Sequence, residues 1–103
     1  MLHRHATPLH NLPSTQRQGL LCSKSQGRLK AVWLATEGKS SWAAMHVAWR
    51  HGSRIEAVIT LEVDVPRLWL RRSRKGLWSC THDIPPDRLR RLFGFVELAR
   101  AAG

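Results

Sequence analysis

Residues 55–65 constrain the fold of this 103-residue chain more than any other segment. Apolar and polar residues alternate there, with Ala57, Ile59, Leu61, Val63 and Val65 on one face and Glu56, Thr60, Glu62 and Asp64 on the other. Because successive side chains of a β-strand point to opposite sides of a sheet, this alternation predicts a long strand with one buried face. Pro66 ends it, since proline has no amide hydrogen to donate to a neighbouring strand.

Shorter elements are expected before that strand. Residues 2–6 predict a first strand that ends at Thr7, and a two-part turn or broken helix then runs to Gly19. Residues 30–35 predict a short buried strand. A helix is expected from Ser40 or Ser41 to residues 51–52. Its apolar stripe is expected to consist of Trp42, Met45 and Trp49, which recur at the spacing of one helical face, with Ala44 and Ala48 beside them.

The remainder of the chain favours a hairpin and a last helix. Residues 67–72 and 77–81 flank the turn segment 73–76. Asp87 follows two prolines and is expected to cap a helix along Leu89, Leu92 and Phe93. Strands outnumber helices, so the sequence predicts a single α+β domain over residues 1–103, with a mainly antiparallel sheet and short helices.

The charge of the chain is strongly positive. Seventeen Lys and Arg residues against seven Asp and Glu residues give a formal net charge of +10. Such a charge favours polyanionic partners, with RNA or DNA first and an anionic membrane second. The excess of Arg over Lys suits bidentate contact with phosphate. The alternative is a basic surface that only keeps the protein soluble.

Two lone cysteines, Cys22 and Cys80, lack the spacing of a metal site and are expected to be reduced. No stretch approaches the roughly 18 apolar residues of a membrane helix. His3, Arg4 and His5 interrupt any apolar signal region at the N-terminus. We therefore expect a cytoplasmic protein with neither a metal nor a membrane partner.

A series of short motifs follows a defined order along the chain. It consists of His5-Ala6-Thr7, Gly19-Leu20, Arg28, the strand-like Val32-Trp33-Leu34-Ala35, the helix-like residues 43–52, the strand 55–65, Gly76-Leu77-Trp78 and Ile84-Pro85-Pro86. This series resembles the C-terminal, NAD-binding lobe of the RNA 2'-phosphotransferases, within the ADP-ribosyltransferase superfamily. The resemblance covers residues 2–90. The N-terminal lobe of the family, which contributes further RNA-binding Arg and His residues, has no counterpart here, so a partner chain that completes the site is one expectation.

The resemblance implies a small split sheet with NAD bound between its halves. His5 would hydrogen-bond a ribose hydroxyl, and the backbone at Ala6, where the family usually has Gly, would hold the nicotinamide amide beside Thr7. Trp33 would stack on the nicotinamide ring, and Arg28 would act on a phosphate-bearing substrate, so His5 and Arg28 are the predicted catalytic residues. The alternatives are a surface His, a core Trp and a solvated Arg. Arg50-His51-Gly52 also resembles the family, with a structural helix end as the alternative.

Many ADP-ribosyltransferases use a Glu late in the fold, and none is present in residues 77–81. Glu62 and Asp64 are expected on a solvated strand face. The missing Glu is in keeping with the RNA 2'-phosphotransferases, which do not rely on it, and equally with an inactive domain.

A basic and aromatic cluster on the predicted hairpin is the candidate nucleic-acid site. Its members are Arg67, Trp69, Arg71, Arg72, Arg74 and Lys75, with Trp78 interleaved. The charges would contact phosphates and exposed indoles would stack on bases, while a solvated turn is the alternative. The sequence thus predicts an ADP-ribosyltransferase-like protein that binds NAD and transfers ADP-ribose to a nucleic-acid or phosphate acceptor, RNA before DNA. The second hypothesis is a non-catalytic nucleic-acid-binding module on the same fold.

Overall fold

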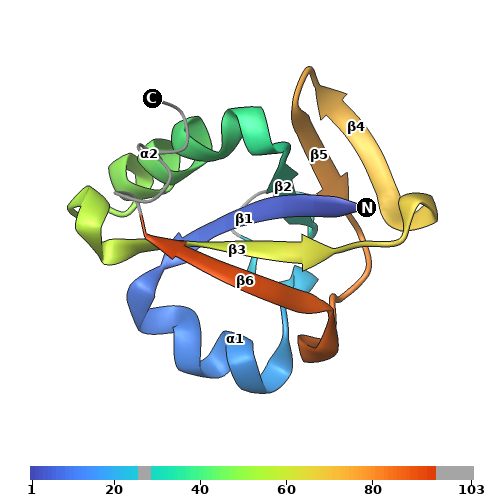
Figure 1. Cartoon of the computed structure of the whole chain (residues 1–103), viewed down its shortest axis with the longest axis horizontal. Helices are drawn as coiled ribbons and strands as arrows, with labels where there is room; N and C mark the ends of the chain where they lie inside the picture. The colour runs from blue at the N-terminus through green and yellow to red at the C-terminus, as the bar shows by residue number, and fades with distance from the viewer. Residues whose placement is uncertain (26–28, 95–103) are drawn as a thin grey trace.

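Residues 1–25 and 29–94, which the computed structural model describes, form six strands and two α-helices (Figure 1). The strands are β1 (Leu2–Pro8), β2 (Val32–Ala35), β3 (Val58–Asp64), β4 (Leu70–Arg74), β5 (Leu77–Cys80) and β6 (Leu89–Gly94). The helices are α1 (Leu12–Gln18) and α2 (Ser40–Arg50), and short 3-10 turns join several of these elements. The α+β class with an antiparallel sheet is therefore confirmed.

The sheet has the strand order β4-β5-β2-β1-β3-β6, and all neighbours are antiparallel. β1 pairs with β3 along its whole length, from Leu2 opposite Asp64 to Pro8 opposite Val58. Between the described parts of β1 and β2, by contrast, Arg4 opposite Ala35 is the one ladder pair. Two well-paired halves, β4-β5-β2 and β1-β3-β6, thus meet at a single point in the middle of the sheet.

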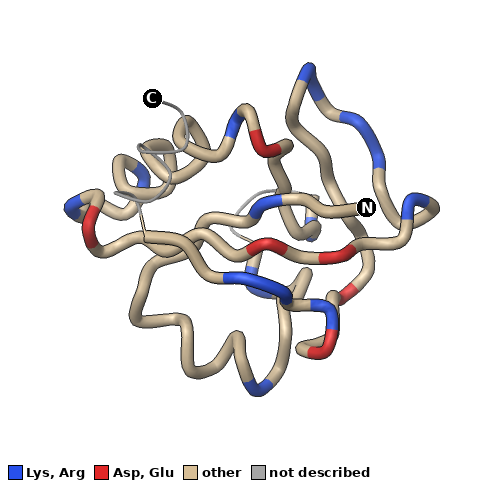
Figure 2. Tube along the Cα trace, in the orientation of Figure 1, with Lys and Arg blue, Asp and Glu red and all other residues tan. Residues whose placement is uncertain are grey.

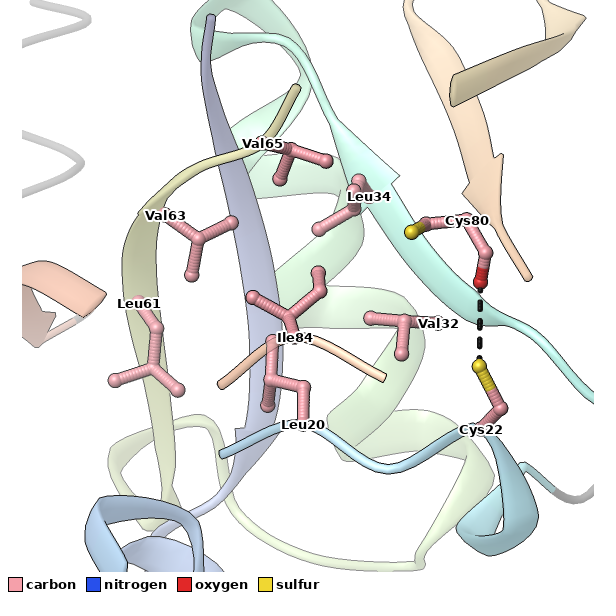
Figure 3. Close-up of a cluster of buried hydrophobic side chains, with 9 residues drawn as sticks. All are labelled: Leu20, Cys22, Val32, Leu34, Leu61, Val63, Val65, Cys80 and Ile84. Carbon is pink, nitrogen blue, oxygen red and sulfur yellow. Dashed lines mark hydrogen bonds between the residues drawn. The ribbon is translucent and has the colours of Figure 1, made fainter. Parts of the chain in front are cut away.

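The larger core cluster lies on the face of the sheet that α1 covers. Leu61, Val63 and Val65 come from β3 and the segment after it, and β2 and β5 contribute Val32, Leu34 and Cys80 (Figure 3). Leu20, Cys22 and Ile84 complete the cluster, in which the Cys22 thiol donates to the carbonyl oxygen of Cys80 at 3.5 Å. Both cysteines are free, in agreement with the reduced state expected from the sequence.

A glycine turn connects α1 to this core. Gly19 ends the helix with a φ of +78°, a backbone conformation that residues with a Cβ rarely adopt. The next residue, Leu20, exchanges two backbone hydrogen bonds of 2.8 Å with Ile84. A Cβ on Gly19 would overlap the carbonyl oxygen of Ile84, so the close approach of these two segments needs a glycine.

The predicted buried face of α2 is wrong. Ala44 and Ala48 face the sheet at 1% and 6% exposure, whereas the expected stripe, Trp42, Met45 and Trp49, is exposed. Ala44 and Ala48 form a second cluster with Ala6 of β1 and Val58 of β3. These short side chains let the helix backbone approach the sheet closely, which leaves no room for an indole between them.

The predicted last helix is also wrong, because residues 89–94 form the edge strand β6 beside β3. Leu92 lies opposite Leu61 and Leu89 lies opposite Val63, with a register shift that leaves Arg90 without an opposite residue. This bulge places Leu89 and Leu92 on one face of the sheet although they are three residues apart. A spacing of three residues is also typical of one face of a helix, so the pattern of Leu89 and Leu92 fits a helix as well as this bulged strand.

The remaining expectations agree with the structure in part. The hairpin is confirmed, with a positive φ at Gly76 in its turn, but its bounds differ from those expected. Residues 67–69 form a 3-10 turn, and β4 extends to Arg74 opposite Leu77, which leaves a two-residue turn. β3 begins at Val58, because Ile55–Ala57 form a 3-10 turn. Glu62 is not on a solvated face, since its side chain is only 13% exposed and pairs with Arg4 at 3.3 Å. Within residues 1–25 and 29–94, no helix is long and apolar enough to cross a membrane.

Candidate functional site

The gap between β1 and β2 opens into a cleft. Beyond the pair Arg4–Ala35 the two strands diverge, and a cavity of about 580 Å³ lies between them. Residues 4–8 of β1 and residues 31–35 in and before β2 line it, together with residues of both helices. This volume is within the range of about 300–1,000 Å³ typical of small-molecule sites.

The cleft reaches both faces of the sheet. Ala6 packs against α2, so His5 and Thr7 point to the opposite face, where α1 lies. Val32 and Leu34 belong to the core on the α1 face, so Trp33 points toward α2. A ligand in the gap would therefore meet His5 and Thr7 on one face and Trp33 on the other.

His5 joins the two halves of the sheet. Its Nδ1 lies 2.8 Å from the carbonyl oxygen of Trp33, and because a carbonyl only accepts, Nδ1 carries the hydrogen. Burial lowers the pKa of His5 from its ordinary value of 6.5, against the opposing effect of that hydrogen bond. The ring is thus neutral near pH 7, and its Nε2, which has no hydrogen-bond partner among the described residues, can accept a hydrogen bond from a ligand.

The other residues that the resemblance assigned to NAD also line the cleft. Ala6 and Thr7 are buried, and the Thr7 hydroxyl accepts a hydrogen bond of 3.4 Å from the Asn11 side chain. Trp33 is 43% exposed, so it is not enclosed in the core. Arg28, the other predicted catalytic residue, lies outside the described residues.

The basic residues of the cleft come from several elements. Arg50 and His51 lie at the end of α2, and Arg74 lies on the hairpin. Lys24 lies in a 3-10 turn after α1. The lining residues include no Asp or Glu within the described chain. Arg4 also lines the cleft, but its guanidinium pairs with Glu62 and lies 4.2 Å from the centre of the Phe93 ring. The cleft therefore suits an anionic ligand.

The hairpin cluster is not assembled as expected. Arg74 alone among its members lines the cleft, while Arg71, Arg72 and Lys75 are exposed elsewhere on the hairpin, and Arg67 is exposed in the turn before β4. Figure 2 shows this concentration of Lys and Arg along the hairpin and a second one near β6.

The two hairpin indoles are not free to stack on bases. Trp69 stacks on His82 with ring centroids 5.0 Å apart, and Arg88 lies over the indole at 5.4 Å. Trp78 packs against the core and meets His3 edge to face. Both indoles therefore serve packing.

Two aromatic residues that line the cleft were not predicted as site residues. Trp42 and His46 stack with their ring centroids 5.1 Å apart and their planes 6° apart. The available signal was their spacing of four residues in a helix, which brings side chains together on one face. The sequence interpretation missed it by assigning Trp42 to the buried face.

Fold and site together define a small basic α+β domain with a ligand-sized cleft at the junction of two sheet halves. Comparison with models of known protein families and with curated proteins finds no match. Among the described residues, no group of three or more His, Cys, Asp or Glu side chains could hold a metal ion. The cleft itself is therefore the feature that points to a function.

Proposed function

We propose that the protein binds NAD in the cleft between β1 and β2 and transfers ADP-ribose to a nucleic-acid or phosphate acceptor, in the manner of the RNA 2'-phosphotransferases. The observation that carries the proposal is the position of His5, Ala6, Thr7 and Trp33 around a single gap in the sheet. A sheet that is joined at one pair is also compatible with the split sheet of the ADP-ribosyltransferase superfamily.

Each lining residue has a chemical role in this proposal. Nε2 of His5 accepts a hydrogen bond from a ribose hydroxyl, and the Trp33 indole stacks on the nicotinamide ring. The edge of β1 beyond Arg4 makes no further ladder pair with the described part of β2, so its backbone groups can hydrogen-bond the nicotinamide amide. The Arg74 guanidinium group contacts the diphosphate.

When bound, NAD supplies the ADP-ribosyl group, whose bond to nicotinamide breaks with the electron pair leaving on the nicotinamide nitrogen while an acceptor oxygen forms the new bond. The cleft stabilises charge rather than providing a covalent nucleophile. A phosphate acceptor is already anionic and needs no protein base, which is in keeping with a described lining without Asp or Glu. The chain's own part is to hold His5 neutral, orient the ribose and position the phosphates.

The first test is the affinity of the purified protein for NAD by calorimetry, for the parent and the His5→Ala variant. Loss of one hydrogen bond to a ribose hydroxyl is expected to weaken binding by about 2- to 12-fold, which corresponds to about 0.5–1.5 kcal/mol. His10→Ala is the matched control, because His10 is exposed and outside the cleft. Nicotinamide release, with and without an RNA that carries a 2'-phosphate, then tests for transfer. A His5→Ala variant that binds NAD as tightly as the parent would contradict the proposal.

A second candidate function is a nucleic-acid-binding module without catalysis. It is favoured by β4, an edge strand on which Arg71, Arg72 and Arg74 are all exposed. In this case binding depends on salt and not on NAD. The hairpin charges then contact phosphates directly.

A further inference from the structure

The outer face of α2 exposes three large apolar side chains in an otherwise polar environment. Trp42 is 49% exposed, Met45 58% and Trp49 78%. They are accessible because Ala44 and Ala48 on the other side of the helix make the contact with the sheet. Exposure of two indoles on one helix face is costly unless something covers them, so this face is a candidate binding surface.

The aromatic rings of this face are arranged as a stack. His46 lies between the two indoles, parallel to Trp42 at 5.1 Å and tilted by 34° to Trp49 at 6.1 Å. Neither indole contacts a second aromatic ring or a cation within residues 1–25 and 29–94. Each therefore keeps one ring face available for another planar group.

Positive charge surrounds the stack. Lys39 precedes α2 and lies close to Gly76 at the tip of the hairpin, and Arg50 ends the helix. Neither forms an ion pair with a described residue, whereas the nearby acids, Glu37 and Glu56, do pair with arginines. Unpaired positive charge thus lies at both ends of α2, and at one end it adjoins the tip of the hairpin.

The same face is continuous with the cleft, because Trp42, His46 and Arg50 line both. We propose that the outer face of α2 binds single-stranded nucleic acid, with unpaired bases stacked on Trp42 and Trp49 and phosphates against Lys39 and Arg50. Given the proposed function, this surface leads the acceptor strand to the cleft. It replaces the hairpin indoles, which are packed, as the site of base contact.

Charge argues against a second copy of this chain on the same face. A symmetric contact would bring Lys39 and Arg50 of two molecules together, in a protein whose net charge is already +10. Like charges at an interface weaken association, whereas a polyanion is attracted by the same groups. Indoles combined with cations are the usual composition of surfaces that bind unpaired bases.

The test uses a labelled single-stranded oligouridylate of about eight nucleotides, a DNA strand of the same length and a duplex, without NAD. Fluorescence anisotropy gives the Kd of the parent and of Trp49→Ala, Trp49→Phe and Met45→Ala. Loss of one stacked base is expected to weaken single-strand binding of Trp49→Ala by about 5-fold or more. Trp49→Phe should retain most of the affinity, and the duplex should show little dependence on Trp49.

Met45→Ala is the matched control, because Met45 is an exposed apolar residue on the same face but cannot stack as a ring. Unchanged single-strand affinity in Trp49→Ala, or equal losses in Trp49→Ala and Met45→Ala, would overturn the proposal. So would Trp49-dependent self-association in size-exclusion chromatography without oligonucleotide binding. Since NAD is omitted, a failure here is distinguishable from a failure of the cleft to bind NAD, which His5→Ala tests separately.

Discussion

His3 is buried at the start of β1 with an incomplete set of polar contacts. It is 2% exposed, its Nδ1 has no hydrogen-bond partner among the described residues, and its ring meets Trp78 edge to face at 5.7 Å. Burial lowers the pKa of His3 from its ordinary value of 6.5, and the positive charge of the N-terminal amine acts in the same direction. Burial likewise lowers the pKa of His5, so two histidines on one strand favour the neutral form in the folded state.

We predict that these histidines make the protein less stable in mild acid. The unfolded chain binds a proton near pH 6.5, while the folded chain resists it, so the free energy of unfolding falls as the pH drops below about 6.5. One such group contributes at most about 1.4 kcal/mol per pH unit. Urea unfolding at about pH 7.5 and about pH 5.5 measures the effect in the histidine range, above the range of carboxyl groups.

His3→Leu should reduce the difference in unfolding free energy between the two pH values, because the share of His3 is removed. His10→Ala is the control, since His10 is exposed. A His3→Leu variant with the same pH dependence as the parent would contradict the assignment.

At the scale of elements, the sequence predicted where structure forms better than which side it faces. The strand alternation of β3 and the glycine of the hairpin turn depend on local chemistry, and the structure confirms the strand and the hairpin, although β3 is shorter than expected. The orientation of α2 depends on how closely it approaches β1, which no local pattern encodes. The spacing of Leu89 and Leu92 has two solutions, a helix and a bulged strand, and the open edge of β3 favours the second.

The sequence named several residues that line the cleft, but the cleft itself was not predictable. Ala6, Thr7 and Trp33 were chosen on a resemblance, and they line the cleft because β1 and β2 diverge after Arg4 and Ala35. That divergence depends on the pairing of each strand with its other neighbour. Trp42 and His46 line the cleft because of the orientation of α2, which the sequence did not predict.

The close fit of α2 against the sheet predicts that added bulk at Ala44 destabilises the protein. Ala44→Leu adds bulk where Ala44, Ala6 and Val58 are in close contact, so we expect a loss of about 1–3 kcal/mol in unfolding free energy. Met45→Leu is a matched control at the neighbouring exposed position and should be near neutral. Chemical denaturation of both variants checks the difference. Equal stability of Ala44→Leu and the parent would mean that the helix is not held this closely.

At the scale of the molecule, positive charge is concentrated on the two edge strands of the sheet. β4 carries Arg71, Arg72 and Arg74, and β6 carries Arg90 and Arg91 (Figure 2). Charged edges hinder pairing with other chains, so an excess of arginine there does not by itself indicate nucleic-acid binding. The two edges differ in their partners, because Arg90 lies 3.5 Å from Asp64 and Arg91 lies over Phe93, while Arg71 and Arg72 form no ion pair with a described residue.

This difference predicts unequal contributions to nucleic-acid binding. Arg71→Gln with Arg72→Gln and Arg90→Gln with Arg91→Gln each lower the net charge of +10 by the same two units. If the hairpin contacts phosphates of a single strand, the first pair should reduce the slope of log Kd against log salt concentration by about 1.4, and the second should leave the slope nearly unchanged. Anisotropy titrations of single-stranded RNA over a series of salt concentrations measure both slopes. Equal reductions of the two slopes would mean that the protein attracts polyanions through its overall positive field. The hairpin would then not be a specific binding site.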